Sequence, residues 1–337
     1  MAKPIVAITM GDPAGVGPEV ILKALAHSEV RKVCHPLVLG DWEVLQRTWR
    51  GKRHYPKLVP WEKGQPIAKS GKAVPVYSLS SLSLKQSLPG YPSKACGEAA
   101  YCYIRKATEL AQSQVADAIA TAPICKRILR LAGHHYPGHT ELLAELTRTR
   151  ECRMMLLGKG LKVVLVTVHL PLAQVARELT RRRVRVTLEL THEALRRYFG
   201  ISHPRLAVAA LNPHAGEEGI FGREEKRIIL PAVTEVKGQG IQAKGPFPAD
   251  TLFHQAVRGD YDAVVCMYHD QGLIPLKLLH FFGGVGLTLG LPLIRTSVDH
   301  GTAYDIAGKD RADDSSMKEA ILLAARLARQ KKRWREQ

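Results

Sequence analysis

The stretch IVAITMGDPAGVGPEVILKALA, residues 5–26, contains the unit that decides the fold class. Its first part, Ile5–Met10, is an apolar run of strand length, and Pro18–Ala26 has a helical pattern. The glycine-containing segment Gly11–Glu19 joins the two. A strand that leads directly into a helix is the repeating element of α/β folds.

The same alternation of strand-length apolar runs and helical patterns continues through most of the chain. Further predicted strands are Leu37–Leu39, Ala118–Thr121, Val163–Val168, Leu206–Leu211 and Ala263–Met267. Further predicted helices are Gly97–Ser113, Thr140–Leu146, Leu172–Tyr198 and Ser315–Lys332. The region Lys52–Pro92 is rich in Pro, Ser, Lys and Gly, and we expect short strands and loops there. This order predicts an α/β fold with a mostly parallel sheet and helices on both faces.

A chain of 337 residues is long for one hydrophobic core and is expected to form two domains that share a cleft. The boundary is placed near Gly133–His139, and the chain is expected to return to the first domain after about Arg295. We therefore predict a discontinuous first domain of residues 1–135 plus 296–337, and a second domain of residues 136–295.

Composition places the chain among cytoplasmic proteins. No apolar run approaches the roughly 20 residues that span a bilayer, and the beginning of the sequence has no charged region followed by a cleavage site. The six cysteines are scattered without a CxxC pair, which favours reduced thiols over a disulfide framework or a zinc knuckle. We expect neither membrane association nor secretion.

The net charge is strongly positive, 49 − 31 = +18, which suits an anionic partner. Two basic runs contribute, at residues 177–185 and 326–335. A nucleic-acid-binding protein is the alternative function of a different class. However, no zinc finger, helix-turn-helix signature or aromatic-studded sheet motif accompanies the charge, so solvated helix faces are the favoured interpretation and nucleic acid is not the expected partner.

Three histidines share one sequence context. Each follows an apolar strand-like run: His169 follows Lys162–Val168, His214 follows Leu206–Pro213, and His269 follows Asp262–Tyr268. In open α/β sheets the carboxyl ends of strands line the ligand crevice. A single histidine there is commonly a loop residue bonded to backbone, but three in matching positions indicate a catalytic metal site with one open coordination position.

Four polar clusters lie in apolar surroundings. They are Gly138–Glu141, Ala249–Thr251, Asp270–Gly272 with Lys277, and Arg295–Ser297 with Asp299–Thr302. Each has a structural explanation when taken singly: Thr140 can cap a helix, Arg295 can pair with a carboxylate, and Lys277 can extend along an apolar edge. Their recurrence beside the three histidines favours a binding site.

Two glycine-rich segments, Gly11–Glu19 and Gly283–Gly290, match neither GxGxxG nor a Walker sequence. The first creates a helix N-terminus that could hold an anion, but a structural turn is an equally good explanation for each. A classical dinucleotide site is therefore not predicted, and no residue is assigned to cofactor binding.

Seven motifs are recognisable together. They are GDPAGVGPE (11–19), PGHTELLA (137–144), TVHLPL (167–172), LNPHAGE (211–217), GPFPADTLF (245–253), YHDQG (268–272) and TLGLPLIRTSVDHGTA (288–303). From about Ile5 to about Asp310 the chain resembles the 4-hydroxythreonine-4-phosphate dehydrogenase family of pyridoxal phosphate biosynthesis.

The resemblance implies the two-domain fold of the isocitrate and isopropylmalate dehydrogenase class, in a homodimer with the site in the cleft near the dimer interface. It implies NAD-dependent oxidation of 4-hydroxythreonine 4-phosphate to a β-keto acid that decarboxylates to 3-amino-2-oxopropyl phosphate. NADP is the alternative cofactor. A divalent metal, Zn, Mg or Co, is also implied.

Site residues are carried over motif by motif. The implied metal ligands, shared between dimer partners in the family, are His169, His214 and His269. The implied substrate-binding residues are His139, Thr140, Lys277 and Arg295. Candidates for proton transfer are Lys277, Asp270 and Asp250.

One position departs from the family pattern. Where the family usually reads GVNxTLGLP, with the Asn touching substrate, this chain has Gly286. A glycine has no side chain for that contact, so the choice of substrate within the family stays open. Relatives in the same family oxidise D-threonate or D-erythronate 4-phosphate, and a further subgroup acts on a dihydrodiol carboxylate.

Overall fold

The computed structural model describes residues 2–67 and 73–336 and divides the chain into two compact units. Unit 1 comprises residues 1–150 and 291–329, and unit 2 comprises residues 151–290 and 330–337. The sequence boundaries at 135/136 and 295/296 differ from these because helix α6 (His139–Leu146) packs on helix α4 (Lys94–Gln112) of unit 1. His139, Thr140 and Arg295 therefore belong to unit 1, whereas we expected them in the second domain.

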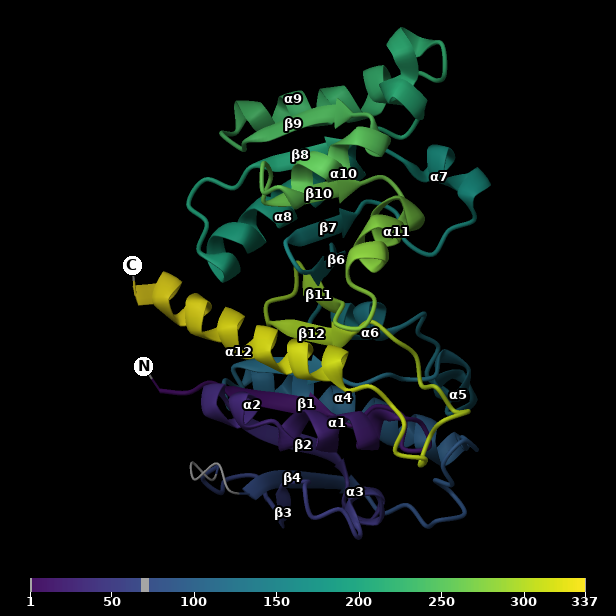
Figure 1. The fold of residues 1–337 in the computed structure, drawn as a ribbon, viewed down its shortest axis with the longest axis vertical. Helices are drawn as coiled ribbons and strands as arrows, with labels where there is room; N and C mark the ends of the chain where they lie inside the picture. Colours follow the sequence, from purple (N-terminus) through teal and green to yellow (C-terminus); the bar gives the residue numbers. More distant parts are fainter. Residues whose placement is uncertain (1, 68–72, 337) are drawn as a thin grey trace. The chain divides into compact units, whose positions relative to one another are not determined.

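Unit 1 is built on a parallel sheet (Figure 1). Its strands are β1 (Ile5–Thr9), β2 (His35–Asp41), β3 (Lys57–Pro60), β4 (Ala73–Ser80), β5 (Ala118–Thr121) and β12 (Arg295–Val298). Its helices are α1 (Gly17–Ala26), α2 (Ser28–Val33), α3 (Trp42–Trp49), α4, α5 (Lys126–Leu131), α6 and most of α12 (Ser315–Glu336). The strand order is β3-β4-β2-β1-β5-β12.

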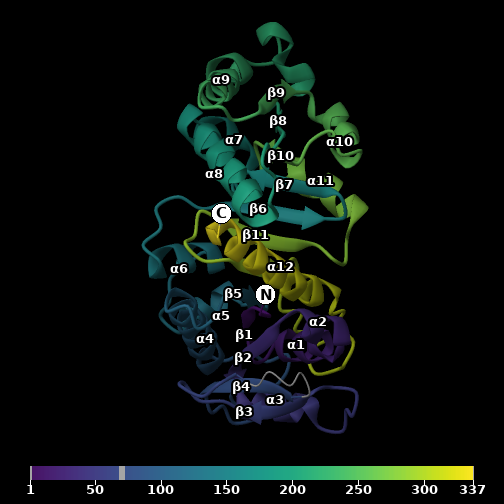
Figure 2. The same cartoon turned by 90° about the vertical axis from the view of Figure 1, so that its left-hand side faces the viewer.

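Strand β1 lies in the middle of the strand order of unit 1 and is buried. It pairs in parallel with β2 on one side and with β5 on the other, and Val6, Ala7 and Ile8 are fully buried. A strand covered on both faces reads as a continuous apolar run, which is the pattern that predicted it. Figure 2 shows α4 and α6 on one side of these strands and α1 and α12 on the other.

Unit 2 has a mixed sheet. Its strands are β6 (Arg153–Gly158), β7 (Leu161–Leu165), β8 (Leu206–Ala209), β9 (Ala243–Phe247), β10 (Ala263–Cys266) and β11 (Val285–Leu289). Its helical segments are α7 (Leu172–Glu178), α8 (Arg181–Phe199), the 3-10 segment Pro213–Gly219, the π segment Glu225–Ile229, α9 (Leu230–Gly238), α10 (Ala249–Val257) and α11 (His269–Leu279). The order is β11-β6-β7-β10-β8-β9, with β6 antiparallel to both neighbours and the remaining pairs parallel. Helices cover both faces, with α8 on one and α10 and α11 on the other (Figure 2).

The predicted single helix over Leu172–Tyr198 was wrong, because the chain breaks between α7 and α8. Leu179 and Thr180 are extended, and the Thr180 hydroxyl accepts a hydrogen bond from the backbone N–H of Arg183. This side-chain cap begins a new helix at Arg181.

The region Lys52–Pro92 forms β3, β4 and loops, and its residues 68–72 lie outside the described part of the chain. Among the described helices, none has the length and apolar character needed to cross a bilayer.

Candidate active site

The three candidate metal histidines follow neighbouring strands of unit 2. Strand β10 pairs in parallel with β7 on one side and β8 on the other, so the carboxyl ends of the three strands meet at one edge of the sheet. His169 follows β7, His214 follows β8 and His269 opens α11 directly after β10. The ring centroids of His169 and His269 are 5.7 Å apart.

His214 lies in a strained turn. Its φ is 52°, and Ala215, Glu217 and Glu218 also have positive φ angles. Non-glycine residues in this region carry a cost of about 1–3 kcal/mol each and occur preferentially at functional sites. The imidazole is exposed, with its ring centroid 6.0 Å from that of Phe221.

A buried carboxylate holds that turn in place. Glu225 is 4% exposed, and its Oε1 accepts from the backbone N–H groups of Leu211, at 2.8 Å, and Asn212, at 2.7 Å. Its Oε2 accepts from the Asn212 side chain at 3.0 Å. Sequence reasoning missed Glu225, although a carboxylate shortly after a proposed ligand loop is a signal for such an anchor.

Within the described part of one chain, no three His, Cys, Asp or Glu side chains are grouped closely enough to hold a metal ion. The structure thus brings His169 and His269 together and places His214 at the same sheet edge without completing a three-ligand cluster in a single chain.

The start of α11 organises the residues around His269. The Nδ1 atom of His269 lies 2.7 Å from Oδ1 of Asp270, which leaves Nε2 available to a ligand. The buried Gln271 accepts from the backbone N–H of Met267 and donates to the carbonyl of Ala210, so it ties the end of β10 to the end of β8. Gly272 permits close packing, because a Cβ there would lie 3.0 Å from the Cys266 sulfur.

The other candidates of unit 2 lie on separate elements. Lys277 is half-buried near the end of α11, with its ammonium 5.5 Å from the ring centroid of Phe281. Asp250 is exposed in the first turn of α10. Gly286 is buried in β11, opposite Leu156 of β6, so most of the glycine-rich segment for which a turn was one of the open explanations forms a strand.

In unit 1, Arg295 at the start of β12 is almost completely buried. Its Nε and Nη2 atoms donate to Oγ1 of Thr121, at 3.1 and 2.7 Å. Burial lowers the pKa of Arg295 to about 9, a shift that the carboxylate of Glu141 opposes. The guanidinium therefore stays charged at neutral pH and is oriented by a neutral hydroxyl. Thr121 was not among the predicted site residues.

His139 begins α6 and interacts electrostatically with Arg295. Burial, reinforced by the positive charge of Arg295, lowers the pKa of His139 well below its ordinary 6.5, so the imidazole is neutral at pH 7. Its Nε2 is fully buried and has no hydrogen-bond partner within the described residues. Buried polar atoms almost always have a hydrogen-bond partner, and a bound ligand would supply one for this nitrogen. Thr140 follows in the same helical turn.

The GDPAGVGPE segment is a packed turn. Asp12 accepts from the hydroxyl of Tyr304 at 2.6 Å and from the backbone N–H of Ala14 at 2.9 Å, and burial raises its pKa. A Cβ at Gly17 would lie 2.1 Å from the carbonyl oxygen of Met10, which only glycine tolerates. Close packing accounts for this glycine.

The basic run at the start of α8 is internally neutralised. Its arginines form ion pairs with glutamates of unit 2: Arg181–Glu235 at 2.7 Å, Arg182–Glu151 at 2.6 Å, Arg183–Glu178 at 2.8 Å and Arg185–Glu189 at 2.8 Å. A run whose charges already have carboxylate partners offers little to a phosphate backbone.

The sequence of this chain is similar to those of a known protein family. Residues 32–324 match the family described as pyridoxal phosphate biosynthetic protein PdxA. The 4-hydroxythreonine-4-phosphate dehydrogenase of Geobacter metallireducens is 55% identical over 98% of this chain and 97% of its own length. The D-threonate 4-phosphate dehydrogenase of Cupriavidus necator is 46% identical over 96% of this chain and 97% of its own length.

Solved structures of proteins with this family name and fold are similar to the structure of this chain. The crystal structure of 4-hydroxythreonine-4-phosphate dehydrogenase from Klebsiella pneumoniae matches 97% of this chain and 100% of its own, at 44% identity and a TM-score of 0.87. Isocitrate dehydrogenase from Methylococcus capsulatus, at 14% identity, has a TM-score of 0.51 over 98% of this chain and 88% of its own. The predicted family resemblance and fold class are both confirmed.

Proposed function

Because this chain belongs to the PdxA family of pyridoxal phosphate biosynthetic proteins, we propose that it oxidises 4-hydroxythreonine 4-phosphate with NAD. The product is a β-keto acid, which loses carbon dioxide to give 3-amino-2-oxopropyl phosphate. The observation that carries this proposal is the 55% identity, over nearly the whole chain, to a relative named for that substrate. A dehydrogenase that takes a phosphorylated hydroxy acid is the coarser activity common to the named relatives.

Charge and burial in unit 1 support binding of the substrate's anionic groups. Arg295 presents a buried guanidinium, and a guanidinium binds carboxylate or phosphate in a bidentate fashion. The neutral His139 offers an unpartnered ring nitrogen beside it. Thr140 adds a hydroxyl at the start of the same helix. We assign these three residues to substrate recognition.

His169, His214 and His269 are proposed to hold a divalent ion, with zinc, magnesium and cobalt as candidates. Three imidazoles suit such an ion, and the hydrogen bond that Nδ1 of His269 donates to Asp270 fixes His269 with Nε2 free to coordinate. When bound, the ion would polarise the substrate hydroxyl and lower its pKa. Lys277, Asp270 and Asp250 are the proposed proton-transfer residues, with Lys277 also available to a carboxylate through Nζ.

Two observations support a homodimer in which partners share the ligands. The described part of a single chain does not group three ligands. In addition, the end of α11 and the residues after it expose large apolar side chains, namely Ile274, Leu278, Leu279, Phe281 and Phe282. Exposed apolar residues at this density are typical of a protein interface. A second copy would cover them beside His269.

The protein is proposed to act in the cytoplasm with a nicotinamide cofactor. All six cysteines are free thiols, which supports a reducing cytoplasm. NAD is the proposed oxidant and NADP the alternative, since the hydride leaving the substrate carbon needs a nicotinamide acceptor.

D-threonate 4-phosphate is the alternative substrate, and D-erythronate 4-phosphate is a second. The 46% identity to a D-threonate 4-phosphate dehydrogenase favours this alternative, as does Gly286 in place of the asparagine usual in the family. With Gly286 buried in β11, only its backbone could replace the lost side-chain contact.

The test is NADH absorbance with EDTA-stripped enzyme given each of the three phosphates, with and without added metal. Metal-restored turnover confined to 4-hydroxythreonine 4-phosphate is the expected result. Preference for D-threonate or D-erythronate 4-phosphate would transfer the assignment to the alternative. Turnover that does not depend on metal, or no NADH formation with any of the three phosphates, would contradict the proposed function.

A further inference from the structure

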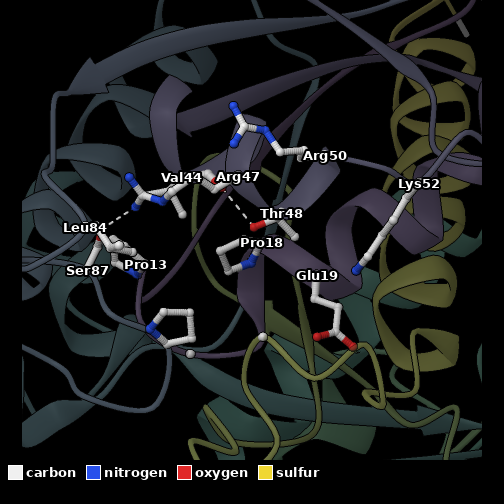
Figure 3. A pocket seen from close by; sticks show the side chains of 13 residues that line it. Pro13, Pro18, Glu19, Val44, Arg47, Thr48, Arg50, Lys52, Leu84 and Ser87 are labelled. Atoms are coloured by element: carbon white, nitrogen blue, oxygen red, sulfur yellow. Dashed lines mark hydrogen bonds between the residues drawn. The ribbon is translucent and has the colours of Figure 1, made fainter.

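Unit 1 contains a cavity of about 220 Å³ that includes none of the proposed metal, substrate or proton-transfer residues (Figure 3). It lies between α1, α3 and the loop at residues 84–89. Its lining residues are Pro13, Gly15, Pro18, Glu19, Val44, Arg47, Thr48, Arg50, Lys52, Leu84, Ser87, Pro89 and Gly308. Figure 3 shows three cationic side chains among these lining residues, those of Arg47, Arg50 and Lys52, which come from α3 and the residues that follow it.

Arg47 turns toward the cavity instead of forming the usual helix ion pair. It donates to Oγ of Ser87 at 2.6 Å and to the carbonyl of Leu82 at 3.4 Å. Glu43 lies four residues earlier on α3, the spacing at which opposite charges normally pair, yet the two form no ion pair. The two bonds engage two of the five N–H groups of Arg47, so three donors remain for a ligand.

Arg50 adds a second guanidinium three residues further along. No hydrogen bond or ion pair of its side chain occurs within the described residues, and it lines the cavity. Arg50 is the C-cap residue of α3, with ψ 127°, so it lies just beyond the helix that carries Arg47. Two cations that line one cavity favour an anionic occupant.

The other charges around the cavity already have partners. Glu19 accepts from Lys23 at 3.0 Å and from the backbone N–H of Ala312 at 2.8 Å. The ammonium of Lys52 lies 3.1 Å from Oδ1 of Asp310. Arg47 on α3 and Arg50 at its C-cap are therefore the cavity's cations that have no carboxylate partner among the described residues.

We propose that this cavity binds a phosphate monoester, with Arg47 and Arg50 gripping the phosphate. Guanidinium groups match phosphate oxygens in a bidentate fork, and Ser87 fixes the orientation of the first of them. Pro13, Pro18, Val44, Leu84 and Pro89 supply apolar walls for the body of the ester. The volume lies below the roughly 300–1,000 Å³ of sites for drug-sized ligands, so the occupant is a small ester or the phosphorylated end of a larger molecule.

Titration of the full-length protein with inorganic phosphate and with glycerol 3-phosphate, followed by calorimetry, tests the proposal. We expect Arg47→Gln and Arg50→Gln each to weaken binding by about tenfold or more. Arg53→Gln is the matched control, because Arg53 is exposed, lies three residues from Arg50 and does not line the cavity. In the Arg295→Gln background, Arg47→Gln and Arg50→Gln should cause the same loss of phosphate binding, which separates the cavity from the proposed substrate site.

Several results would overturn the proposal: no saturable binding, equal weakening by Arg53→Gln, or binding of malonate in place of phosphate. Arg50 is exposed and has no structural contact to lose, so Arg50→Gln remains informative if Arg47→Gln unfolds. Competition then identifies the source of the phosphate. Displacement by NADP and not by NAD would indicate the 2′-phosphate of the cofactor. Displacement by neither, with the arginine effect intact, would indicate a free phosphate ester.

Discussion

Arg295 donates from both Nε and Nη2 to the single side-chain oxygen of Thr121, although 174 residues separate the two in the chain. The hydroxyl orients the guanidinium and carries no charge of its own. In buried surroundings the attraction between a guanidinium and an anion is stronger than in water. In the proposed function that anion is the substrate.

Thr121→Val keeps the shape of the side chain and removes the acceptor. Leaving a buried charged group without this partner costs about 1.5–3 kcal/mol. We expect the KM for the phosphorylated substrate to rise about tenfold, with a smaller change in kcat. Steady-state kinetics measure this, and urea unfolding monitors the fold. Thr108→Val is the control, because its buried hydroxyl donates to the Ile104 carbonyl within α4, far from any proposed site residue in the chain. An unchanged KM in Thr121→Val would refute the positioning role.

His139 gives the protein a predictable pH dependence. Its pKa is lowered in the folded state, so the unfolded chain binds more protons than the folded one below pH 6.5. The free energy of unfolding should therefore decrease as pH falls below 6.5, by up to about 1.4 kcal/mol per pH unit until the folded pKa is reached. Above that range His139 contributes no pH dependence.

His139→Gln should remove this component, so urea unfolding at pH 7.5 and 5.5 should differ less in the variant than in the wild type. His203→Gln, at an exposed position, is the matched control. Equal pH dependence in wild type and His139→Gln would rule out the lowered pKa.

Glu225→Gln weakens the anchor of the His214 turn. The amide oxygen can still accept from the backbone N–H groups of Leu211 and Asn212, but it lacks the charge that strengthens these bonds. The amide NH2 cannot accept from the Asn212 side chain, as Oε2 does. Groups that orient metal ligands typically contribute 10–100-fold in metal affinity. We expect a loss of that order for zinc, measured by competition with a chromogenic chelator. Glu189→Gln on α8 removes a carboxylate away from the histidines and should leave affinity unchanged.

Leu278→Lys tests the homodimer. Leu278 is 85% exposed, so a lysine there costs the single chain little, but burying that ammonium against a second copy is unfavourable. We expect monomers in sedimentation velocity and loss of turnover. Leu131→Lys, an exposed leucine of α5 in unit 1, is the control and should stay dimeric. A Leu278→Lys protein that remains dimeric and active would exclude this surface.

Gly286→Asn restores the side chain usual in the family. A new neutral hydrogen bond contributes about 1 kcal/mol, so kcat/KM for 4-hydroxythreonine 4-phosphate should rise about fivefold relative to D-threonate 4-phosphate. An unchanged ratio would indicate that Gly286 is not a specificity position.

Strands with an unbroken apolar sequence could be predicted from the sequence, whereas a strand interrupted by glycine could not. Ala118–Thr121 was placed with its observed bounds, because a strand buried on both faces needs an unbroken apolar run. Strand β11 was missed because its Gly286 reads locally as a turn, and its antiparallel pairing with β6 is a long-range contact. The break between α7 and α8 depends on one hydroxyl, that of Thr180, within a pattern that otherwise continues.

The candidate site also contains residues that could be predicted from the sequence and residues that could not. Proximity of His169 and His269 was foreseeable, since strand-end residues of adjacent parallel strands meet at one edge. Thr121 acts through a contact with Arg295, 174 residues away in the chain, which no local pattern encodes, and it was found only in the structure. Glu225 follows the His214 loop closely enough to be a candidate anchor, but its bonds to Leu211 and Asn212 were seen only in the structure.

The discontinuity of unit 1 sets an order of events at the ribosome. Strand β12, which carries Arg295, pairs with β5 and follows every strand of unit 2 in the chain. Chains are synthesised from the N-terminus, so all strands of unit 2 are available to fold while the sheet of unit 1 still lacks one member. The guanidinium proposed to receive the substrate is thus among the last parts of the sheet to be put in place during translation.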